Sequence, residues 1–122
     1  MHTAELYAVF SAHPQVTTDS RRTIRDCLFF ALRGDAFDGN RFAADALVQG
    51  AAYAVVDDKA LAGKPRYIYV PDVLQALQDL ARHHRRQFDI PVVGITGSNG
   101  KTTTKELVAG VLGARYRVHF TR

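Results

Sequence analysis

The amino-acid sequence predicts an α/β protein: a small N-terminal α/β domain over residues 1–90, then the first strand, turn and helix of a second, truncated domain over residues 91–122. Three observations predict this class. In the first part, short apolar runs alternate with stretches of helical period, as in sheets that are covered by helices. Pro91 breaks the chain between the two parts. After it, a glycine-rich turn joins a β-branched run to an amphipathic helix.

The first part is expected to hold about three helices and three strands. Leu6, Val9 and Phe10 lie on one face at helical spacing, and Asp72 is a favourable N-cap for a later helix. The strands are indicated by short apolar runs bounded by glycine, proline and aspartate. In chain order, the expected elements are a helix over 3–12, a polar turn at 19–21, a strand over 27–32, a helix over 41–48, strands over 52–56 and 66–70, and a helix over 73–88.

The helix expected over residues 41–48 is defined by its apolar side chains. Phe42, Ala46 and Leu47 are expected to face inward, and Gly50 is expected to end the helix.

Two residues with reactive side chains are expected to serve packing. His84 lies on the apolar stripe of the last helix, and no second metal-ligating residue lies at a suitable spacing on that face. Cys27 is the only cysteine, so it forms no internal disulfide and is expected to be buried rather than nucleophilic. A single thiol suits a reducing cytoplasm, and the sequence has neither a signal-peptide layout nor an apolar run of about 18 residues. We therefore expect a cytoplasmic protein with no membrane partner.

The positive charge lies almost entirely in the second part. Residues 1–90 carry eleven basic and eleven acidic side chains, whereas residues 91–122 carry five basic and one acidic, which accounts for the net charge of +4. Positive charge around a glycine-rich turn is expected for a triphosphate site. The basic cluster at 83–86 ends a predicted helix and is expected to be solvated, and no basic stripe with interleaved aromatic residues is present. Nucleic acid is therefore not expected as a partner.

The glycine-rich turn is a candidate phosphate-binding loop. Gly97 and Gly100 allow several backbone N–H groups to point at one anion, and the start of the following helix adds positive potential. Lys101 can neutralise the β- and γ-phosphates and is the candidate catalytic residue, and the Thr102 hydroxyl can coordinate Mg²⁺. The candidate cofactor-binding residues are Gly97, Ser98, Asn99, Gly100, Lys101, Thr102 and Thr103.

This loop reads T-G-x-x-G-K-T and differs from the Walker A pattern, because Ile95 stands where that pattern requires glycine. The alternative is a glycine-rich turn followed by a solvated lysine. The strand-like run before the turn and the helical pattern after it favour nucleotide binding.

The second part is too small for a complete ATPase domain. It is expected to contain a strand over 92–96, a helix that runs to about Leu112 and ends at Gly113, and the start of a strand over 116–120. A strand of this kind needs neighbours on both edges and cover on both faces. We therefore expect a fragment of a longer enzyme that is inactive by itself and either self-associates or frays in its last third.

Two blocks of the sequence together resemble the Mur ligase family, the ATP-dependent amide-forming enzymes of peptidoglycan precursor synthesis. The family's own phosphate loop has the form T-G-x-x-G-K-T, which explains the departure from Walker A. The resemblance extends over nearly the whole chain. The matching segments are 18–21, 27–34, 37–42 and 50–51 in the first block and 95–103 in the second.

The resemblance implies a three-domain enzyme, with an N-terminal domain for the UDP part of the substrate, a central ATPase and a C-terminal acceptor domain. It is strongest to the members that join D-alanyl-D-alanine to a UDP-N-acetylmuramoyl tripeptide through an acyl phosphate, with ATP and Mg²⁺. Such an enzyme is expected to be a monomer. The alternatives are another ligase of the family, such as the one that adds the third residue, and a non-catalytic UDP-sugar-binding module.

The resemblance also implies a UDP site in the first domain. A hydroxyl and a guanidinium at Ser20 and Arg21 suit uridine and diphosphate, although Asp19 and Arg21 can equally pair to fix a turn. The glycines and the aspartate of the next loop can shape it around a ligand or simply form a turn. The candidate substrate-binding residues are Ser20, Arg21, Gly34, Asp38 and Gly39.

Overall fold

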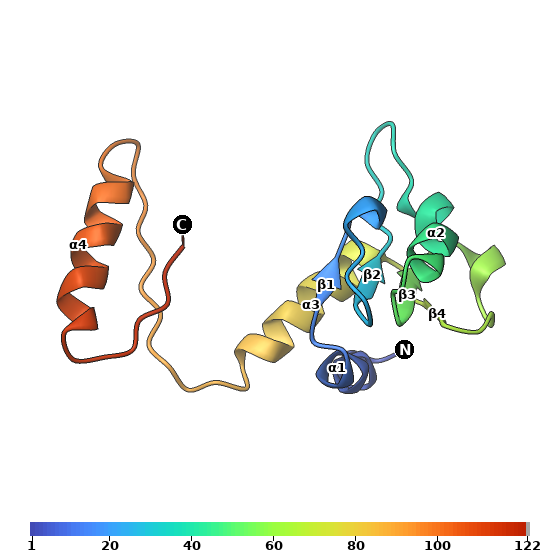
Figure 1. The fold of residues 1–122 in the computed structure, drawn as a ribbon, viewed down its shortest axis with the longest axis horizontal. Helices are drawn as coiled ribbons and strands as arrows, with labels where there is room; N and C mark the ends of the chain where they lie inside the picture. The colour runs from blue at the N-terminus through green and yellow to red at the C-terminus, as the bar shows by residue number, and fades with distance from the viewer. Residues whose placement is uncertain (122) are drawn as a thin grey trace. The chain divides into compact units, whose positions relative to one another are not determined.

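The computed structural model describes residues 1–121, which divide into two compact units, one from Met1 to Phe88 and one that begins at Asp89 (Figure 1). The first unit is built on a sheet of four parallel strands in the order β1-β2-β3-β4: β1 (Val16–Thr17), β2 (Leu28–Phe30), β3 (Tyr53–Val56) and β4 (Tyr67–Tyr69). The α/β class is confirmed. Strand β1 was not predicted, because two residues carry no periodicity; it is defined by its pairing with β2, Val16 with Leu28 and Thr17 with Phe29.

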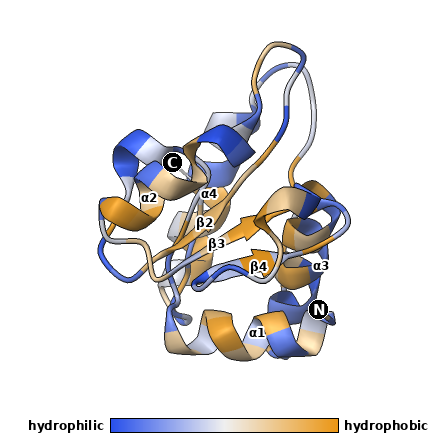
Figure 2. Cartoon of the chain, turned by 90° about the vertical axis from the view of Figure 1, so that its right-hand side faces the viewer, coloured by the Kyte–Doolittle hydropathy of each residue, from blue (hydrophilic) through white to orange (hydrophobic). Residues whose placement is uncertain are grey.

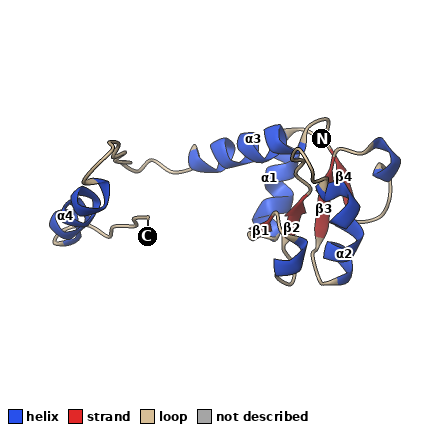
Figure 3. Cartoon of the chain, turned by 90° about the horizontal axis from the view of Figure 1, so that it is seen from above, coloured by secondary structure: helices blue, strands red, loops and turns tan. Residues whose placement is uncertain are grey.

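Helices cover both faces of this sheet. Helices α1 (Thr3–Ala12) and α3 (Val73–Arg85) lie on one side of the strands and α2 (Ala43–Val48) lies on the other (Figure 3). The side chains of β2 alternate between the two layers: Leu28 and Phe30 pack with α1 and α3, whereas Phe29 packs with α2. All three are fully buried, which explains why this strand reads as a continuous apolar run. Figure 2 shows the hydrophobic colour along β3 as well, where Ala54, Val55 and Val56 are buried.

Helix α3 begins and packs as the sequence predicts. Asp72 accepts a hydrogen bond from the backbone N–H of Gln75 at 3.1 Å, which caps the helix. His84 is a packing residue: its Nδ1 lies 3.1 Å from the hydroxyl of Tyr7 on α1, and its ring meets those of Phe10 and Phe88 edge-on. The helix ends at Arg85, three residues before the predicted end at Phe88.

The segment predicted as a helix over 41–48 is instead a 3₁₀ turn, η2 (Gly39–Phe42), followed by the shorter helix α2. The prediction that Phe42 faces inward is wrong. Phe42 is 36% exposed and its ring stacks on that of Phe37, because the tighter turn carries it outward and Ala43 takes the buried position. Ala46 is buried, as predicted.

The second unit contains the predicted helix but not the predicted strands. Helix α4 (Lys101–Gly113) has the expected bounds, whereas residues 92–96 and 116–120 form no strand in the described structure. Val92 and Val93 are 67% and 61% exposed. A strand requires a hydrogen-bonded neighbour, and the described part of this unit supplies none for the run that precedes the loop.

No helix within residues 1–121 combines the length and the apolar character that a membrane-spanning segment requires.

Candidate functional site

The residues predicted to bind UDP lie in the loops that follow β1 and β2. Ser20 and Arg21 come after β1, and Gly34, Asp38 and Gly39 come after β2. Because β1 and β2 are adjacent and parallel, both loops leave the carboxyl edge of the sheet, which is where open α/β sheets bind ligands. The fold therefore brings the two groups of residues to one edge.

The loop after β1 is held by the pairing of Asp19 with Arg21. Asp19 Oδ1 accepts hydrogen bonds from the backbone N–H of Arg21 at 2.9 Å and from its Nε at 3.0 Å, and Oδ2 accepts one from Nη2 at 3.1 Å. Hydrogen bonding by the Arg21 side chain lowers the pKa of Asp19. Asp19 and Arg21 therefore pair to fix the turn, which is one of the two roles expected for Arg21. The Arg21 side chain is also 87% exposed, and half-buried Ser20 precedes it in the turn η1 (Ser20–Arg22).

The two glycines of the loop after β2 differ. Gly39 is buried and donates its N–H to the carbonyl of Leu32 at 2.8 Å. A Cβ at this position would lie 2.7 Å from that carbonyl oxygen and 2.8 Å from the Leu32 nitrogen, so a side chain does not fit. A Cβ on Gly34 would approach only the Cβ of Phe37, at 3.9 Å. Gly39 is therefore required by the close approach of two backbone segments.

A polar network that the sequence analysis did not identify lies beneath this loop. Asn40 is only 6% exposed, and its Nδ2 donates to Oδ1 of Asp38 at 2.8 Å and to Oδ1 of Asp57 at 2.9 Å. Its Oδ1 accepts the backbone N–H groups of Asp57 and Asp58, at 3.1 and 3.3 Å. Asn40 and Asp57 are seventeen positions apart in the sequence. No local pattern in the sequence could indicate this contact.

The carboxylate of Asp57 connects three segments. Its Oδ1 also accepts Nε of Arg33 at 2.9 Å, and its Oδ2 accepts the backbone N–H of Val73, the first residue of α3, at 3.2 Å. Burial raises the pKa of Asp57, but the hydrogen bonds from Asn40, Val73 and Arg33 together outweigh it, so the pKa is lowered. Asp38, which caps η2, has its pKa lowered by the hydrogen bonds from the Asn40 side chain and backbone.

An exposed aromatic pair lies beside the network. The rings of Phe37 and Phe42 are stacked, with centroids 5.3 Å apart and planes 10° apart, and the two residues are 48% and 36% exposed. Two phenylalanine rings that face solvent next to the candidate site offer a flat apolar surface. This pair is not predicted from the sequence, because the helical pattern over residues 41–48 places Phe42 in the core.

In the second unit, the glycine-rich turn combines two glycines at positive φ with an uncapped helix start. Gly97 and Gly100 have φ of +144° and +78°, in the left-handed region that favours glycine. Helix α4 begins directly after Gly100, without a side-chain cap, and its first helical hydrogen bond is donated by the N–H of Thr104 to the carbonyl of Gly100 at 2.9 Å. The N–H groups of residues 101–103 therefore have no acceptor within the helix and are available to an anion.

The side chains of the loop also fit a nucleotide phosphate. Lys101 is the first residue of α4, and its Cγ lies 4.0 Å from where a Cβ of Gly97 would stand, so its stem lies against the loop. Thr102 follows in the first turn and is exposed. Among the described residues, no group of three or more His, Cys, Asp or Glu side chains could hold a metal by itself. A single hydroxyl suits an Mg²⁺ ion whose other ligands are phosphates and water.

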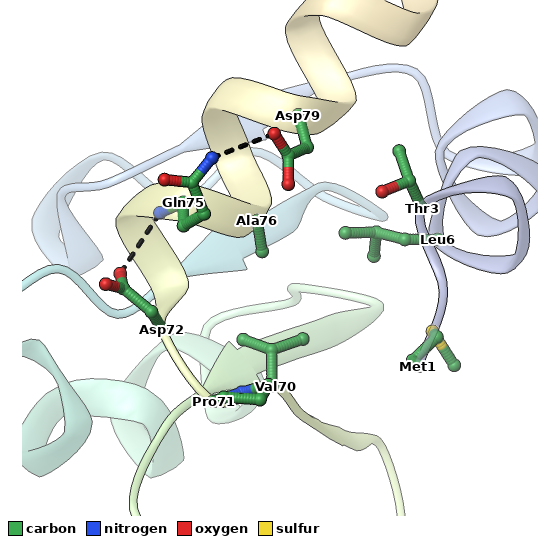
Figure 4. A pocket seen from close by; sticks show the side chains of 9 residues that line it. All are labelled: Met1, Thr3, Leu6, Val70, Pro71, Asp72, Gln75, Ala76 and Asp79. Atoms are coloured by element: carbon green, nitrogen blue, oxygen red, sulfur yellow. Dashed lines mark hydrogen bonds between the residues drawn. The ribbon is translucent and has the colours of Figure 1, made fainter.

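A separate pocket lies between the start of α1 and the first half of α3 (Figure 4). Its carboxylates are already engaged: Asp72 caps α3, and Asp79 accepts hydrogen bonds from Nε2 of Gln75 at 2.9 Å and Nη1 of Arg82 at 3.1 Å. None of the predicted site residues lines it.

Known proteins with similar sequences and structures identify the family. A UDP-N-acetylmuramoyl-tripeptide–D-alanyl-D-alanine ligase of Synechocystis is 46% identical over 110 residues, which cover 88% of this chain and 24% of that protein. A UDP-N-acetylmuramoyl-L-alanyl-D-glutamate–2,6-diaminopimelate ligase of Aquifex aeolicus is 38% identical, over 80% of this chain and 20% of that protein. The chain thus spans about a quarter or less of the length of these relatives.

A solved structure that is similar to this chain belongs to the same group of enzymes. The MurF ligase of Thermotoga maritima, in complex with ADP, superposes with a TM-score of 0.76 at 33% identity, over 88% of this chain and 25% of that one. The model of the Mur ligase family catalytic domain matches residues 14–85, and that of the Mur ligase middle domain matches residues 95–122. Since the first match alone spans more than half of the sequence and contains the whole carboxyl edge described above, the chain belongs to the Mur ligase family.

Proposed function

We propose that this chain is the N-terminal part of an ATP-dependent ligase that joins D-alanyl-D-alanine to a UDP-N-acetylmuramoyl tripeptide. The observation that carries the proposal is the T-G-x-x-G-K-T loop at the uncapped start of α4, in a chain of the Mur ligase family. The choice of this member rests on the 46% identity to the ligase of that name, against 38% to the diaminopimelate-adding ligase.

The two units have different tasks in this proposal. Residues 1–90 form the domain that binds the UDP moiety, through the carboxyl-edge loops of β1 and β2, and residues 91–122 open the ATP-binding domain. Ser20 and Arg21 would contact uridine or diphosphate, and Gly34, Asp38 and Gly39 would shape the neighbouring loop around the ligand. The exposed rings of Phe37 and Phe42 give this edge an apolar surface against which a uracil ring can pack.

The phosphate loop would bind ATP through the N–H groups at the start of α4. Lys101 would neutralise charge on the β- and γ-phosphates, and the glycines would keep the backbone close to them. Thr102 would hold Mg²⁺, which neutralises phosphate charge when bound. These residues position and stabilise the transferring phosphoryl group and form no covalent bond with it.

The reaction would run in two steps. The terminal carboxylate of the peptide attacks the γ-phosphorus of ATP, which yields an acyl phosphate and ADP. The amine of D-alanyl-D-alanine then attacks the acyl carbon, so that an amide forms and inorganic phosphate leaves. We further propose a cytoplasmic monomer for the full-length enzyme, and the single buried thiol of Cys27 is consistent with a reducing compartment.

Phosphate release by the full-length protein tests this assignment. We expect release only when ATP, UDP-N-acetylmuramoyl tripeptide and D-alanyl-D-alanine are all present. Release with a UDP-N-acetylmuramoyl dipeptide and a free amino acid would instead assign the ligase of the third residue. Binding of UDP without any response to ATP would support the non-catalytic UDP-sugar-binding module.

A further inference from the structure

The loop after β2 is exposed but rests on a buried polar base. Residues 33–37 are exposed, and the loop closes through a bridge between Arg33 and Asp38 and a turn in which the N–H of Gly34 donates to the carbonyl of Phe37 at 2.7 Å. Below it lie Asn40, at 6% exposure, and the Asp57 side chain, at 12%. The conformation of the loop therefore depends on side chains that a ligand at the surface does not reach.

Asp57 and Asn40 together connect the loop after β2 to the start of α3. Asp57 receives hydrogen bonds from Arg33 at the start of the loop, from Asn40 in the turn that ends it, and from the N–H of Val73 at the start of α3. In the opposite direction, Oδ1 of Asn40 accepts a hydrogen bond from the backbone N–H of Asp57. The Nδ2 group of Asn40 also donates to Asp38. Both oxygens of Asp57 are acceptors in this network, so replacement of either oxygen by a donor leaves a partner unsatisfied in a part-buried site.

We propose that Asn40 and Asp57 are positioning residues for the uridine diphosphate moiety, and that they hold the loop over residues 33–38 in the conformation that binds it. The inference rests on the proposed function, because it takes this loop as part of the UDP site. Neither residue need touch the ligand. Their effect passes through the Arg33 guanidinium, which Asp57 anchors through Nε, and through Asp38, which Asn40 orients.

The test compares Asp57→Asn with Asp58→Asn in the full-length enzyme. Asparagine at 57 keeps only one acceptor oxygen, so its NH₂ must face either the N–H of Val73 or the donors of Arg33 and Asn40. Asparagine at 58 keeps the cap on η3 (Lys59–Leu61), where Asp58 accepts the N–H of Ala60 at 2.9 Å. We expect Asp57→Asn to raise the KM for the UDP-linked peptide about tenfold or more, with kcat and the KM for ATP within about twofold of the wild type. Asp58→Asn should change none of these constants.

Arg33→Gln provides a second variant in case Asp57→Asn does not fold. The Arg33 side chain is 53% exposed, so its removal spares the core while it releases the loop from Asp57. It should raise the same KM severalfold. A lowered melting temperature in either variant with an unchanged KM for the UDP-linked peptide would show a purely structural network and overturn the inference.

Titration of the wild-type enzyme with UDP separates the two proposals. If the wild type binds UDP and the variants bind it equally well, the positioning role fails and the proposed function stands. If the wild type does not bind UDP, the UDP site itself is wrong, and both proposals fall.

Discussion

Among single residues, Gly39 and Gly34 belong to the same candidate site but differ in the space that a side chain would have. Both lie in the loop after β2, but only Gly39 lies where a Cβ would meet backbone atoms at less than 3 Å. At Gly34 the nearest atom would be 3.9 Å away. Steric requirement thus explains Gly39, whereas a contact with ligand remains the proposed reason for Gly34.

Gly39→Ala should therefore destabilise the first unit and Gly34→Ala should not. Overpacking against rigid backbone costs about 1–3 kcal/mol, which corresponds to a melting temperature lower by about 4–8 °C per kcal/mol in a domain of this size. Thermal unfolding followed by circular dichroism measures the difference. Equal melting temperatures of the two variants would mean that the strand end after β2 moves aside to make room.

Lys101 is the residue on which the phosphate-loop assignment depends most. Lys101→Ala in the full-length enzyme should reduce turnover by about 10²–10³, because a preorganised charge contact to the transferring phosphoryl group is lost. Affinity for the UDP-linked substrate should stay nearly unchanged, since uridine is assigned to the other unit. Steady-state kinetics together with UDP titration provide the measurement, and a variant that keeps half of its turnover would refute the role.

Thr102 can be separated from its neighbours by a matched series. Thr102→Ser keeps the oxygen that would bind Mg²⁺ and should remain active, whereas Thr102→Val keeps the shape, removes the oxygen and should be inactive. Thr103→Val and Thr104→Val are the controls and should be tolerated better. Equal damage at all three positions would point to helix packing instead of metal binding.

At the scale of elements, aspartates cap the short helices at the carboxyl edge. Asp19, Asp38 and Asp58 each accept the N–H of the residue two positions later, at the start of η1, η2 and η3 respectively. These bonds satisfy N–H groups that a helix leaves without partners at its start. At Asp19 and Asp38 the hydrogen bonds lower the pKa of the carboxyl group, which links the stability of the sheet edge to pH.

The first unit should lose stability in acid. The pKa values of Asp38 and Asp57 are lowered from 3.8. Between the folded and unfolded pKa values the unfolded chain binds more protons, so the free energy of unfolding rises with pH there. The stabilisation is complete above the unfolded pKa and is lost as the pH falls through the lowered folded pKa. Urea unfolding between pH 2 and pH 7 should show a plateau above about pH 5 and a decline below about pH 4.

Asp38→Asn isolates one contribution to this decline. An asparagine oxygen can accept the same two bonds that Oδ1 of Asp38 accepts, from the N–H and the Nδ2 of Asn40, but it does not titrate. The variant should therefore lose less stability between pH 5 and pH 2 than the wild type. An identical pH dependence of the two proteins would exclude Asp38 as a contributor.

On the scale of the whole molecule, the two units differ in how much of each is buried. The first unit has buried clusters on both faces of its sheet, whereas no residue of α4 in the second is buried. Leu107 and Val111 on α4 are 66% and 75% exposed and form an apolar face of this helix together with Val108 and Leu112. The second unit thus has no core of its own within the described residues.

Hydrogen exchange should reveal this difference directly. In a dilute, monomeric sample, amides of residues 28–30 and 53–56 should be protected far more than those of 92–96 and 116–120, because only the former belong to a paired and covered sheet. Mass spectrometry of peptides from the exchanged chain provides the measurement. Equal protection of both sets in a monomer would show that the second unit is self-sufficient and would contradict its interpretation as part of a larger domain.

What the sequence alone determined was local. The α/β class, the bounds of α1 and α4 and the cap on α3 are confirmed, because helical periodicity, capping residues and glycine spacing act within a few residues of chain. The T-G-x-x-G-K-T pattern and the matching segments of the first part together indicated the Mur ligase family, which is confirmed. The contacts between strands could not be predicted from local sequence in this way. Strand β1 exists only through its pairing with β2, and the run at 92–96 remains unpaired although its composition suits a strand.

The polar network beneath the loop after β2 was decided by tertiary structure in the same way. Asn40 and Asp57 meet because β2 and β3 are parallel neighbours whose carboxyl ends share one edge. Asparagine and aspartate are ordinary residues of turns, and the sequence within a few positions of either one gives no sign of a contact between them. Hydrogen bonds within a helix or a tight turn join near neighbours in sequence, whereas those of a sheet and its edge join distant ones, and only the folded chain determines which segments meet.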